Sequence, residues 1–367
     1  MMQITAAVSR ADQAAPSLEQ LELEAPRAGE MLVRIAAVGI CHTDLHEHPG
    51  RHAPHPIVLG HEGAGVVEAL GEGVRGFAVG DHVLLSGSSC GTCASCVAGR
   101  PTYCDLAMPM NFGGKRLDGS TALSCGAEKV HSHFFGQSSF ATHSIVPERT
   151  AVKVDKDLPL ELIAPLGCGV ITGAGSVIEA LKVKAGDTIA VLGTGGVGLS
   201  AVMAARLVGA RRIVAVDIDQ ARLDLALELG ATDIVRADSE NVAQQIRSIT
   251  GRGVDFSFNT TTVAAVHTIA LECLAMNGTA GFVAAPRGEW APAMFPMLAG
   301  GRQLRGILGG DANPRTFLPM LIDYWRQGRF PFDKLIRTYR FDEIDKAFHD
   351  SEKGTVIKAV LKVGEPA

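Results

Sequence analysis

The sequence has no block of like charge and no long apolar segment, and each absence argues against a class of protein. The net charge of −5 is spread over 367 residues, whereas a nucleic acid or an anionic membrane would require a basic surface. The uncharged stretch from Ile189 to Ala205 is too short and too rich in glycine to span a membrane. We therefore expect neither partner. There is also no internal repeat and no low-complexity segment.

The N-terminal residues, Met1 to Asp12, have no apolar core of the kind found in export signals. We therefore expect a cytoplasmic location. The eight cysteines are then expected to be reduced thiols or metal ligands rather than disulfides.

The length predicts two domains. The first part of the chain is predicted to form short strands separated by turns, with candidates at 31–38 and 63–70 and a third that follows a turn within 80–85. This pattern is typical of an irregular, β-rich domain.

Four cysteines within fifteen positions, spaced C-x2-C-x2-C-x7-C, interrupt that β-rich part. Four thiolates so close on one loop can close a tetrahedral structural zinc site, which has no open position for chemistry. Free cysteines or an iron–sulfur cluster are the alternatives. The predicted ligands of this structural zinc are Cys90, Cys93, Cys96 and Cys104.

Three further candidates are far apart in the chain: Cys41, His61 and Cys168. Two thiolates and an imidazole suit Zn²⁺ and leave the fourth position open, as a catalytic zinc requires. Thr43 and His46 follow the first candidate, so a hydroxyl and a titratable imidazole could move a proton there. A lone cysteine or histidine is more often packed or solvated, and the sequence alone gives no geometry.

Other residues could support the same site. Asp44 could accept the ring N–H of a ligand histidine. Aromatic rings at Phe112, Phe134 and Phe135 could line an apolar pocket, although core packing is the default for phenylalanine.

Beyond Cys168 the pattern changes to alternating strands and helices. A buried parallel strand at 187–192 precedes the glycine-rich motif 193–198, G-x-G-x-x-G, and a helix follows it over 199–208. A second strand, 212–216, ends at Asp217. This context predicts a Rossmann dinucleotide site. Gly193 would allow the tight turn, Gly195 the approach of the pyrophosphate, and Gly198 the packing of helix on strand.

Asp217 favours NAD over NADP, because its carboxylate can accept hydrogen bonds from both ribose hydroxyls and would repel a 2′-phosphate. Arg222 could favour NADP, but the carboxylate at the strand end normally determines which of the two cofactors binds. Further strand candidates at 233–235, 254–258 and 278–283 continue the βαβ pattern to about residue 305. A helix at 317–326, a second at 341–353 and a last strand at 356–363 are expected to pack back on the first domain.

The whole chain resembles the zinc-dependent medium-chain alcohol dehydrogenase family. The matching motifs are 60–67 (GHEGAGVV), the four-cysteine loop, and the glycine-rich motif with Asp217. Within the family it is most similar to aryl-alcohol (benzyl alcohol) and terpenoid (geraniol and perillyl) alcohol dehydrogenases. The runs that carry this closer match are 134–142, 165–169, 172–176 and 328–336.

The resemblance implies an α/β fold: a Rossmann doubly wound parallel sheet, residues 170–305, beside an irregular GroES-like catalytic domain, residues 1–169 and 306–367. It implies that Cys41, His61 and Cys168 hold the catalytic zinc, with Glu62 behind the metal. Thr43 and His46 would form the proton relay.

Cofactor contacts follow from the motif and the resemblance together. His42 would face the pyrophosphate, Thr172 the nicotinamide carboxamide and Lys358 a cofactor phosphate. The full predicted set is His42, Thr172, Gly193, Gly195, Gly196, Val197, Gly198, Asp217, Arg222 and Lys358. Ser86 stands where many relatives have a phenylalanine, which would leave room for a bulkier alcohol.

The sequence therefore predicts an enzyme with two zinc ions per chain that oxidises a primary aromatic or allylic alcohol to the aldehyde. The reaction would proceed by zinc-bound alkoxide formation and hydride transfer to NAD. A terpenoid alcohol is the alternative substrate. A zinc-free quinone or enone reductase and a zinc- and nucleotide-binding redox sensor are the other classes considered. Apolar segments within 282–308 could pair across a homodimer or homotetramer interface.

Overall fold

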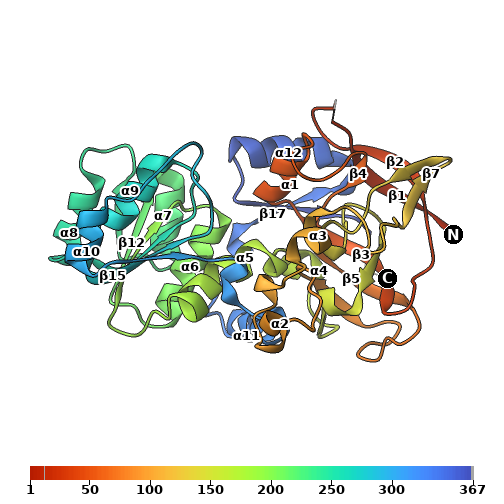
Figure 1. Cartoon of the computed structure of the whole chain (residues 1–367), viewed down its shortest axis with the longest axis horizontal. Helices are drawn as coiled ribbons and strands as arrows, with labels where there is room; N and C mark the ends of the chain where they lie inside the picture. The colour runs from red at the N-terminus through yellow and green to blue at the C-terminus, as the bar shows by residue number, and fades with distance from the viewer. Residues whose placement is uncertain (12, 365–367) are drawn as a thin grey trace. The chain divides into compact units, whose positions relative to one another are not determined.

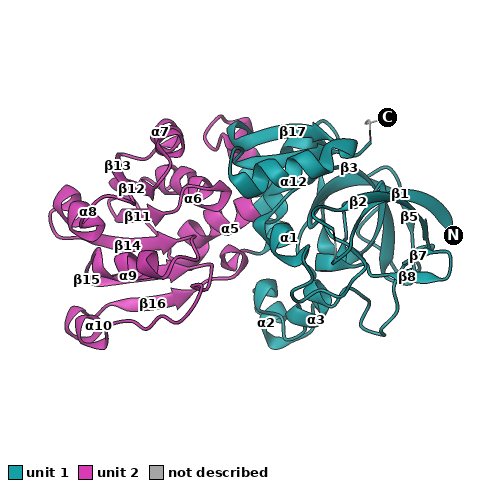
Figure 2. Cartoon of the chain, turned by 90° about the horizontal axis from the view of Figure 1, so that it is seen from above, with its two compact units in different colours: residues 1–168, 313–322, 333–367 teal, residues 169–312, 323–332 magenta. Residues whose placement is uncertain are grey.

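The structure is a computed structural model that describes residues 1–11 and 13–364. It contains two compact units (Figures 1 and 2). Unit 1 comprises Met1–Cys168, Asn313–Ile322 and Asp333–Ala367, and unit 2 comprises Gly169–Ala312 and Asp323–Phe332. The C-terminal segment that we assigned to the catalytic domain is thus divided between the units.

Unit 1 is built on two sheets. The first has the strand order β4 (Ile57–Val58), β1 (Met2–Ser9), β2 (Ser17–Leu23), β7 (Leu123–Cys125) and β8 (Glu128–Val130). The second has the order β10 (Ala151–Val154), β6 (His82–Leu85), β5 (Glu62–Leu70), β3 (Glu30–Gly39), β18 (Lys358–Lys362) and β17 (Ile336–Arg340), and β9 (His143–Pro147) also pairs with β3. The three strands predicted in this part correspond to β3, β5 and β6.

Short helices connect these strands. The α-helices of unit 1 are α1 (His42–Glu47), α2 (Ala94–Val97), α3 (Ala107–Phe112), α4 (Leu160–Ile163) and α12 (Ile344–Lys353), and α11 (Pro314–Arg326) contributes to both units. The 3₁₀ turns are η1 (Pro101–Tyr103), η2 (Phe134–Gly136), η3 (Glu148–Thr150), η4 (Ala164–Gly167), η7 (Phe332–Leu335) and η8 (Phe341–Glu343).

The pairing of β3 with β5 positions the candidate site. The two strands are antiparallel, and Gly39 at the end of β3 lies opposite Glu62 at the start of β5. Cys41 follows the first of these residues and His61 precedes the second, so the register brings both metal-ligand candidates together. A Cβ at Gly39 would lie 2.1 Å from Glu62 Oε2, which explains why this strand end requires glycine.

The C-terminal tail completes the same sheet. Strand β18 is antiparallel to β3, with Leu361 opposite Val38, so the tail packs on the first part of the chain as predicted. The predicted helix over 341–353 is shorter than expected, because Phe341–Glu343 forms a 3₁₀ turn before α12 begins.

Unit 2 is a six-stranded sheet in which every neighbouring pair is parallel. Its strand order is β13 (Asp233–Arg236), β12 (Arg212–Asp217), β11 (Thr188–Leu192), β14 (Val254–Asn259), β15 (Leu274–Phe282) and β16 (Gln303–Gly306). The order in which strands are added reverses between β11 and β14: β12 and β13 follow on one side of β11, and β14, β15 and β16 on the other. Doubly wound sheets bind ligands at this switch point. The predicted doubly wound parallel sheet is confirmed.

The helices of unit 2 cover this sheet. They are α5 (Gly169–Gly175), α6 (Gly196–Leu207), α7 (Gln220–Leu229), α8 (Val242–Thr250), α9 (Ala264–Glu272) and α10 (Met294–Gly300), with a π-helical turn η5 (Ser176–Ala180) and a 3₁₀ turn η6 (Gly309–Asp311). Among the described residues, no single helix is long and apolar enough to cross a membrane; one bent pair, 160–167 with 169–180, meets that criterion only when its two parts are taken together.

Candidate active site

The three predicted ligands of the catalytic zinc meet in unit 1. The Sγ atoms of Cys41 and Cys168 are 3.9 Å apart, and ligand atoms of Cys41, His61, Glu62 and Cys168 all lie within 4.8 Å of one another. Two sulfurs on a tetrahedral zinc are separated by about 3.8 Å, given Zn–S bonds of about 2.3 Å. The spacing therefore fits the ion.

His61 is held with one ring nitrogen directed at this group. Its Nδ1 lies 3.0 Å from Asp44 Oδ1, and the ring is fully buried. Its Nε2 is buried and has no hydrogen-bond partner among the described residues. A buried polar nitrogen without a partner is costly, and a metal bound at Nε2 would remove that cost. The structure confirms the predicted position of Asp44, since the carboxylate that fixes a ligand histidine is a usual part of a zinc site.

Asp44 joins the two ligand segments. Its Oδ2 accepts a hydrogen bond from the Cys41 backbone N–H (3.0 Å), and its Oδ1 also accepts one from the Gly60 N–H (3.0 Å). Asp44 is fully buried. The Asp44 carboxylate on α1 therefore fixes the position of the backbone at Cys41 and the orientation of the His61 ring.

The two thiols of the site differ in acidity. The hydrogen bond from Cys168, with the charge of His61 beside it, lowers the pKa of Cys41 well below its ordinary value. The same hydrogen bond and burial raise the pKa of Cys168. Cys41 and Cys168 thus share one proton between their sulfurs. A divalent cation would displace this proton, because metal binding requires thiolates.

Glu62 and Lys358 form a buried ion pair behind these ligands. Lys358 Nζ lies 2.8 and 2.9 Å from the two Glu62 oxygens and 3.1 Å from the Ile40 carbonyl. Burial raises the pKa of Glu62, and the charge of Lys358 opposes that rise. This buried pair gives Lys358 a partner other than the cofactor phosphate that we predicted for it.

Aromatic rings surround the ligand histidine. The Phe135 ring stacks on His61 with centroids 4.4 Å apart, and the Phe134 ring meets it edge-on at 5.6 Å. Phe112 packs edge-on against Phe135 at 5.1 Å. Phe135 has a left-handed backbone, with φ of 52°, a costly conformation for an aromatic residue. The predicted aromatic residues therefore gather at the metal-ligand group.

Gln137 is a residue that sequence reasoning did not single out. Its Nε2 donates to the carbonyls of His61 (2.9 Å) and Ser86 (3.2 Å), and its Oε1 accepts from Gly63 N–H (3.1 Å). The Ser86 hydroxyl in turn donates to the Gly167 carbonyl (2.7 Å), next to Cys168. This network fixes the strand ends that carry the ligands, and glutamine in a loop gives no pattern that would reveal it.

The remaining polar candidates lie on α1. Thr43 Oγ1 is 3.7 Å from Cys41 Sγ. His42 is exposed at the helix start. His46 lies one helical turn beyond Thr43, and its side chain is 42% exposed. Thr43 and His46 therefore share one face of the helix.

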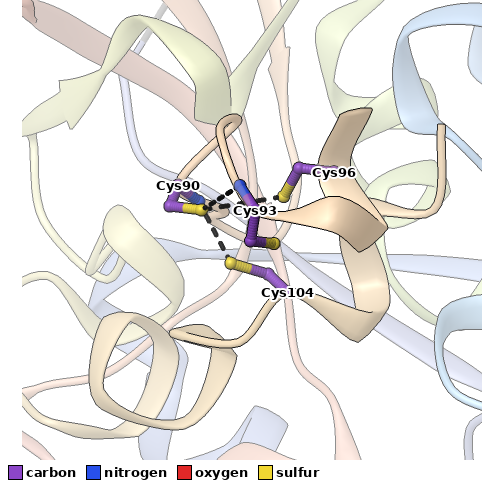
Figure 3. A group of neighbouring side chains, drawn as sticks. All are labelled: Cys90, Cys93, Cys96 and Cys104. Atoms are coloured by element: carbon purple, nitrogen blue, oxygen red, sulfur yellow. Dashed lines mark hydrogen bonds between the residues drawn. The ribbon is translucent and has the colours of Figure 1, made fainter. Parts of the chain in front are cut away.

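The four cysteines of the predicted structural site come together on one lobe, with their sulfurs turned toward one another (Figure 3). The Sγ atoms of Cys90 and Cys96 are 3.9 Å apart. Backbone N–H groups of Thr92 and Cys93 donate to Cys90 Sγ, both at 3.4 Å, and the Thr92 bond leads in lowering the pKa of Cys90 to about 6. Donors aimed at a thiolate and a tetrahedral spacing both fit zinc.

The glycine-rich turn of unit 2 has the predicted local geometry. Gly193 has φ of +88°, and a Cβ at Gly198 would lie 1.8 Å from the Gly193 carbonyl oxygen. A Cβ at Gly195 would meet no atom within 4 Å, so backbone N–H groups there are open to approach. Gly196 and Val197 form the first residues of α6. The turn fits a pyrophosphate at a helix N-terminus.

Asp217 ends β12 beside this turn. Its Oδ2 accepts hydrogen bonds from the backbone N–H (2.6 Å) and hydroxyl (2.9 Å) of Thr194, and its Oδ1 accepts one from the Asp219 N–H (3.0 Å). Arg222 lies on α7, with Nε 3.9 Å from Asp219 Oδ2. Thr172 lies on α5. The structure thus brings Asp217 and the glycine turn together.

Comparison with known proteins defines the class. Residues 27–156 match the alcohol dehydrogenase GroES-like domain, and residues 196–323 match the zinc-binding dehydrogenase domain. The chain therefore belongs to the zinc-type medium-chain alcohol dehydrogenases, which confirms the predicted family and the GroES-like part of the fold.

Three individual proteins are similar to the chain over nearly its whole length. The chain is 47% identical over 350 residues to a geraniol dehydrogenase of Castellaniella defragrans, covering 94% of each chain. A benzyl alcohol dehydrogenase of Acinetobacter calcoaceticus has a solved structure that is 40% identical, with a TM-score of 0.96, 99% of this chain and 100% of that chain covered. An alcohol dehydrogenase zinc-binding domain protein from Burkholderia ambifaria is 47% identical, with a TM-score of 0.97 and the same coverage.

Proposed function

We propose that the chain is an NAD- and zinc-dependent dehydrogenase that oxidises primary aromatic or allylic alcohols to aldehydes. The observation that carries the proposal is the buried, unpartnered Nε2 of His61 beside two thiol sulfurs 3.9 Å apart. Family membership supports it, because zinc-type alcohol dehydrogenases are what the chain's two domains match.

Cys41, His61 and Cys168 would hold the zinc, which when bound supplies a Lewis acid that lowers the pKa of an alcohol hydroxyl. Two thiolates and a neutral imidazole leave such a site with no net charge. Thr43, 3.7 Å from Cys41 Sγ, would accept the hydroxyl proton. His46, one turn further along α1 and partly exposed, would carry the proton toward solvent.

The aromatic wall supports the substrate class. Phe135 stacks on His61, and Phe112 packs against Phe135, so an alcohol bound near the ligands would meet flat, apolar surfaces. Ser86, where many relatives have a phenylalanine, contributes no aromatic ring to this wall, and its hydroxyl donates a hydrogen bond to the Gly167 carbonyl. A benzylic or allylic group fits such a wall better than the short chain of ethanol.

A terpenoid alcohol is the second candidate substrate. The relative that favours it is the geraniol dehydrogenase with 47% identity. The two candidates share the reacting carbon, a primary alcohol next to a π-system, and differ in the bulk beyond it.

NAD is the proposed hydride acceptor. The glycine turn leaves space at Gly195, and the carboxylate of Asp217 is fixed beside it by Thr194. A fixed carboxylate favours ribose hydroxyls and repels a 2′-phosphate. Arg222 ion-pairs with Asp219, which reduces its availability to a phosphate.

We also propose that the chain forms a homodimer, or a dimer of dimers, through the edge of the unit 2 sheet. All four residues of edge strand β16 are exposed. Nearby apolar side chains are exposed too, namely Met276 (65%), Met294 (61%), Phe295 (80%) and Leu298 (75%). An exposed apolar edge of this kind is normally covered by another chain.

Ligand variants test the proposed function. Cys41→Ser and His61→Ala should each lose at least about a thousandfold in kcat with NAD⁺ and benzyl alcohol, because metal polarisation supplies several kcal/mol. Zinc analysis should show loss of the catalytic ion only. Cys273→Ser, at a buried thiol outside both cysteine groups, is the matched control. Full turnover by a folded, zinc-depleted ligand variant would refute the proposal.

A further inference from the structure

A third group of metal-binding side chains lies on the surface of unit 1, at the end of α1. It consists of His46, Glu47 and His52, whose ligand atoms all lie within 4.8 Å of one another. Glu47 Oε1 is 3.0 Å from His46 Nδ1 and 2.9 Å from His52 Nδ1. Both imidazoles therefore direct their Nδ1 atoms at Glu47 Oε1.

The carboxylate of this group is buried and rigid. The Glu47 side chain is only 2% exposed, and its Oε2 accepts hydrogen bonds from the backbone N–H groups of His52 and Ala53, both at 3.0 Å. Burial opposes the ionisation of Glu47, but the hydrogen bonds from His52, His46 and this backbone together lower its pKa to about 2. The anion is thus held in place, with Oε1 turned to the two imidazoles.

The imidazoles are accessible from solvent. The side chain of His46 is 42% exposed and that of His52 is 62% exposed. Their rings are stacked, with centroids 5.6 Å apart and planes 17° from parallel. Both imidazoles are thus partly open to solvent, the side from which an ion would approach the group.

The spacing is somewhat shorter than that of a zinc site, because hydrogen bonds and not a metal hold the three side chains together. Zinc–nitrogen and zinc–oxygen bonds of about 2.1 Å place tetrahedral ligands about 3.4 Å apart. The two nitrogen–oxygen separations are 3.0 and 2.9 Å, so each of these two pairs needs to open by only about 0.5 Å. Two imidazoles and a carboxylate are a ligand set that zinc accepts, with a fourth position left for water.

We propose that His46, Glu47 and His52 form a third zinc site, separate from the two cysteine sites. Zinc at His46 Nδ1 would take this ring nitrogen out of proton transfer, so the third ion would inhibit the enzyme. The inhibition, unlike the binding, rests on the proposed relay function of His46.

Arg51 is expected to oppose the binding of zinc at this third site. Its Nη1 lies 3.2 Å from His46 Nε2, which places the proton of a neutral ring on Nδ1, the atom that would bind zinc. Metal at Nδ1 moves that proton to Nε2, so the exposed Arg51 side chain must turn away. Arg51→Gln removes the positive charge that opposes the ion, and it is therefore expected to bind the third ion more tightly.

The test measures zinc bound by the zinc-loaded enzyme at equilibrium with buffered free Zn²⁺. The wild type should bind one ion more than its two cysteine sites hold. His52→Ala should weaken this extra ion at least about tenfold, and Arg51→Gln should strengthen it. His55→Ala is the control, because this nearby ring bonds to the Ala53 and His48 carbonyls and not to Glu47. Co²⁺ at the third site should absorb without the sulfur-to-metal charge transfer of the cysteine sites.

Two results would overturn the site: no extra ion in the wild type, or an extra ion that His52→Ala binds equally well. Turnover with NAD⁺ and benzyl alcohol is measured in the same titration near pH 7, where the relay is expected to matter, with each variant compared with its own rate before zinc is added. An extra ion that binds as predicted without slowing turnover would leave the metal site intact and refute the relay function of His46.

Discussion

At the residue scale, the candidate site combines metal-ligand candidates with polar residues that hold them in place. Cys41, His61 and Cys168 were recognisable because zinc ligands are restricted to a few residue types, and the structure brings them together. Gln137 and Glu47 were not recognisable, since a single polar residue in a loop or helix has no pattern until folding gives it partners. The ion pair of Lys358 with Glu62 was missed for the same reason.

The relay is tested at His46. His46→Gln keeps a hydrogen-bonding side chain but cannot titrate, so kcat should fall about tenfold or more near pH 7 and recover at alkaline pH, where solvent removes the proton directly. The measurement is the pH profile of kcat from pH 6 to 10. His143→Gln, on a ring paired with Glu68 at β9, is the control. An unchanged profile would exclude His46 as the relay.

Glu30 is predicted to make stability depend on pH. Burial opposes the ionisation of Glu30, but the nearby His133 ring, 3.7 Å away, and hydrogen bonds from Arg116 and the Arg27 N–H lower its pKa from 4.5 to about 2. A folded-state pKa below the unfolded one stabilises the fold above about pH 4.5, and the gain disappears as the pH falls toward 2. Glu30→Gln should therefore lose about 3 kcal/mol of unfolding free energy at pH 7, and less at pH 4.

Denaturant unfolding at both pH values checks this prediction. Glu128→Gln is the matched control, because its partner Arg10 lies in an exposed pair, where ion pairs contribute little. A Glu30→Gln penalty that is the same at pH 4 and pH 7 would contradict the account.

At the scale of elements, regular segments were predictable and their connections were not. Buried parallel strands gave continuous apolar runs in β11 and β12, and β14 gave an alternation of apolar and polar residues, so all three were found close to their observed bounds. Edge strand β16 and strand β17 were missed, because exposed or short strands lack that signal. The turn η2 was also missed, since the left-handed Phe135 is imposed by tertiary contacts and not by local preference.

The four-cysteine lobe should depend on its metal. It is a loop with only two short helical turns, α2 and η1, whose residues are not buried, so zinc would supply most of its order. Cys96→Ser is expected to bind one zinc ion fewer per chain and to lower Tm. Metal analysis and calorimetry measure both effects, with the exposed Cys125→Ser as the control. Equal zinc content in the two variants would refute the structural site.

The end of β12 should set the cofactor preference. Asp217→Asn keeps the shape but removes the charge, so kcat/KM for NAD⁺ should fall about tenfold or more and NADP⁺ should be used relatively better. Asp219→Asn, at the residue that caps α7, is the comparison. A ratio of NAD⁺ to NADP⁺ activity that stays constant in Asp217→Asn would refute its role.

At the scale of the whole molecule, the apolar edge of the unit 2 sheet predicts assembly. Replacing Phe295 and Leu298 together by glutamate places charges on a surface that we expect a second chain to bury. Sedimentation velocity should then show monomers where the wild type sediments as a dimer or tetramer. Leu227→Glu, at an exposed leucine on α7, should not change the assembly. A monomeric wild type would contradict the proposal.

The central claim, oxidation of an alcohol next to a π-system, is tested most directly by comparing substrates. Formation of NADH at alkaline pH would be measured in parallel with benzyl alcohol, geraniol and ethanol. The account predicts that benzyl alcohol or geraniol exceeds ethanol in kcat/KM by orders of magnitude, and the better of the two identifies the substrate branch. Ethanol as the best substrate, or no turnover of any of the three by the zinc-loaded protein, would contradict it.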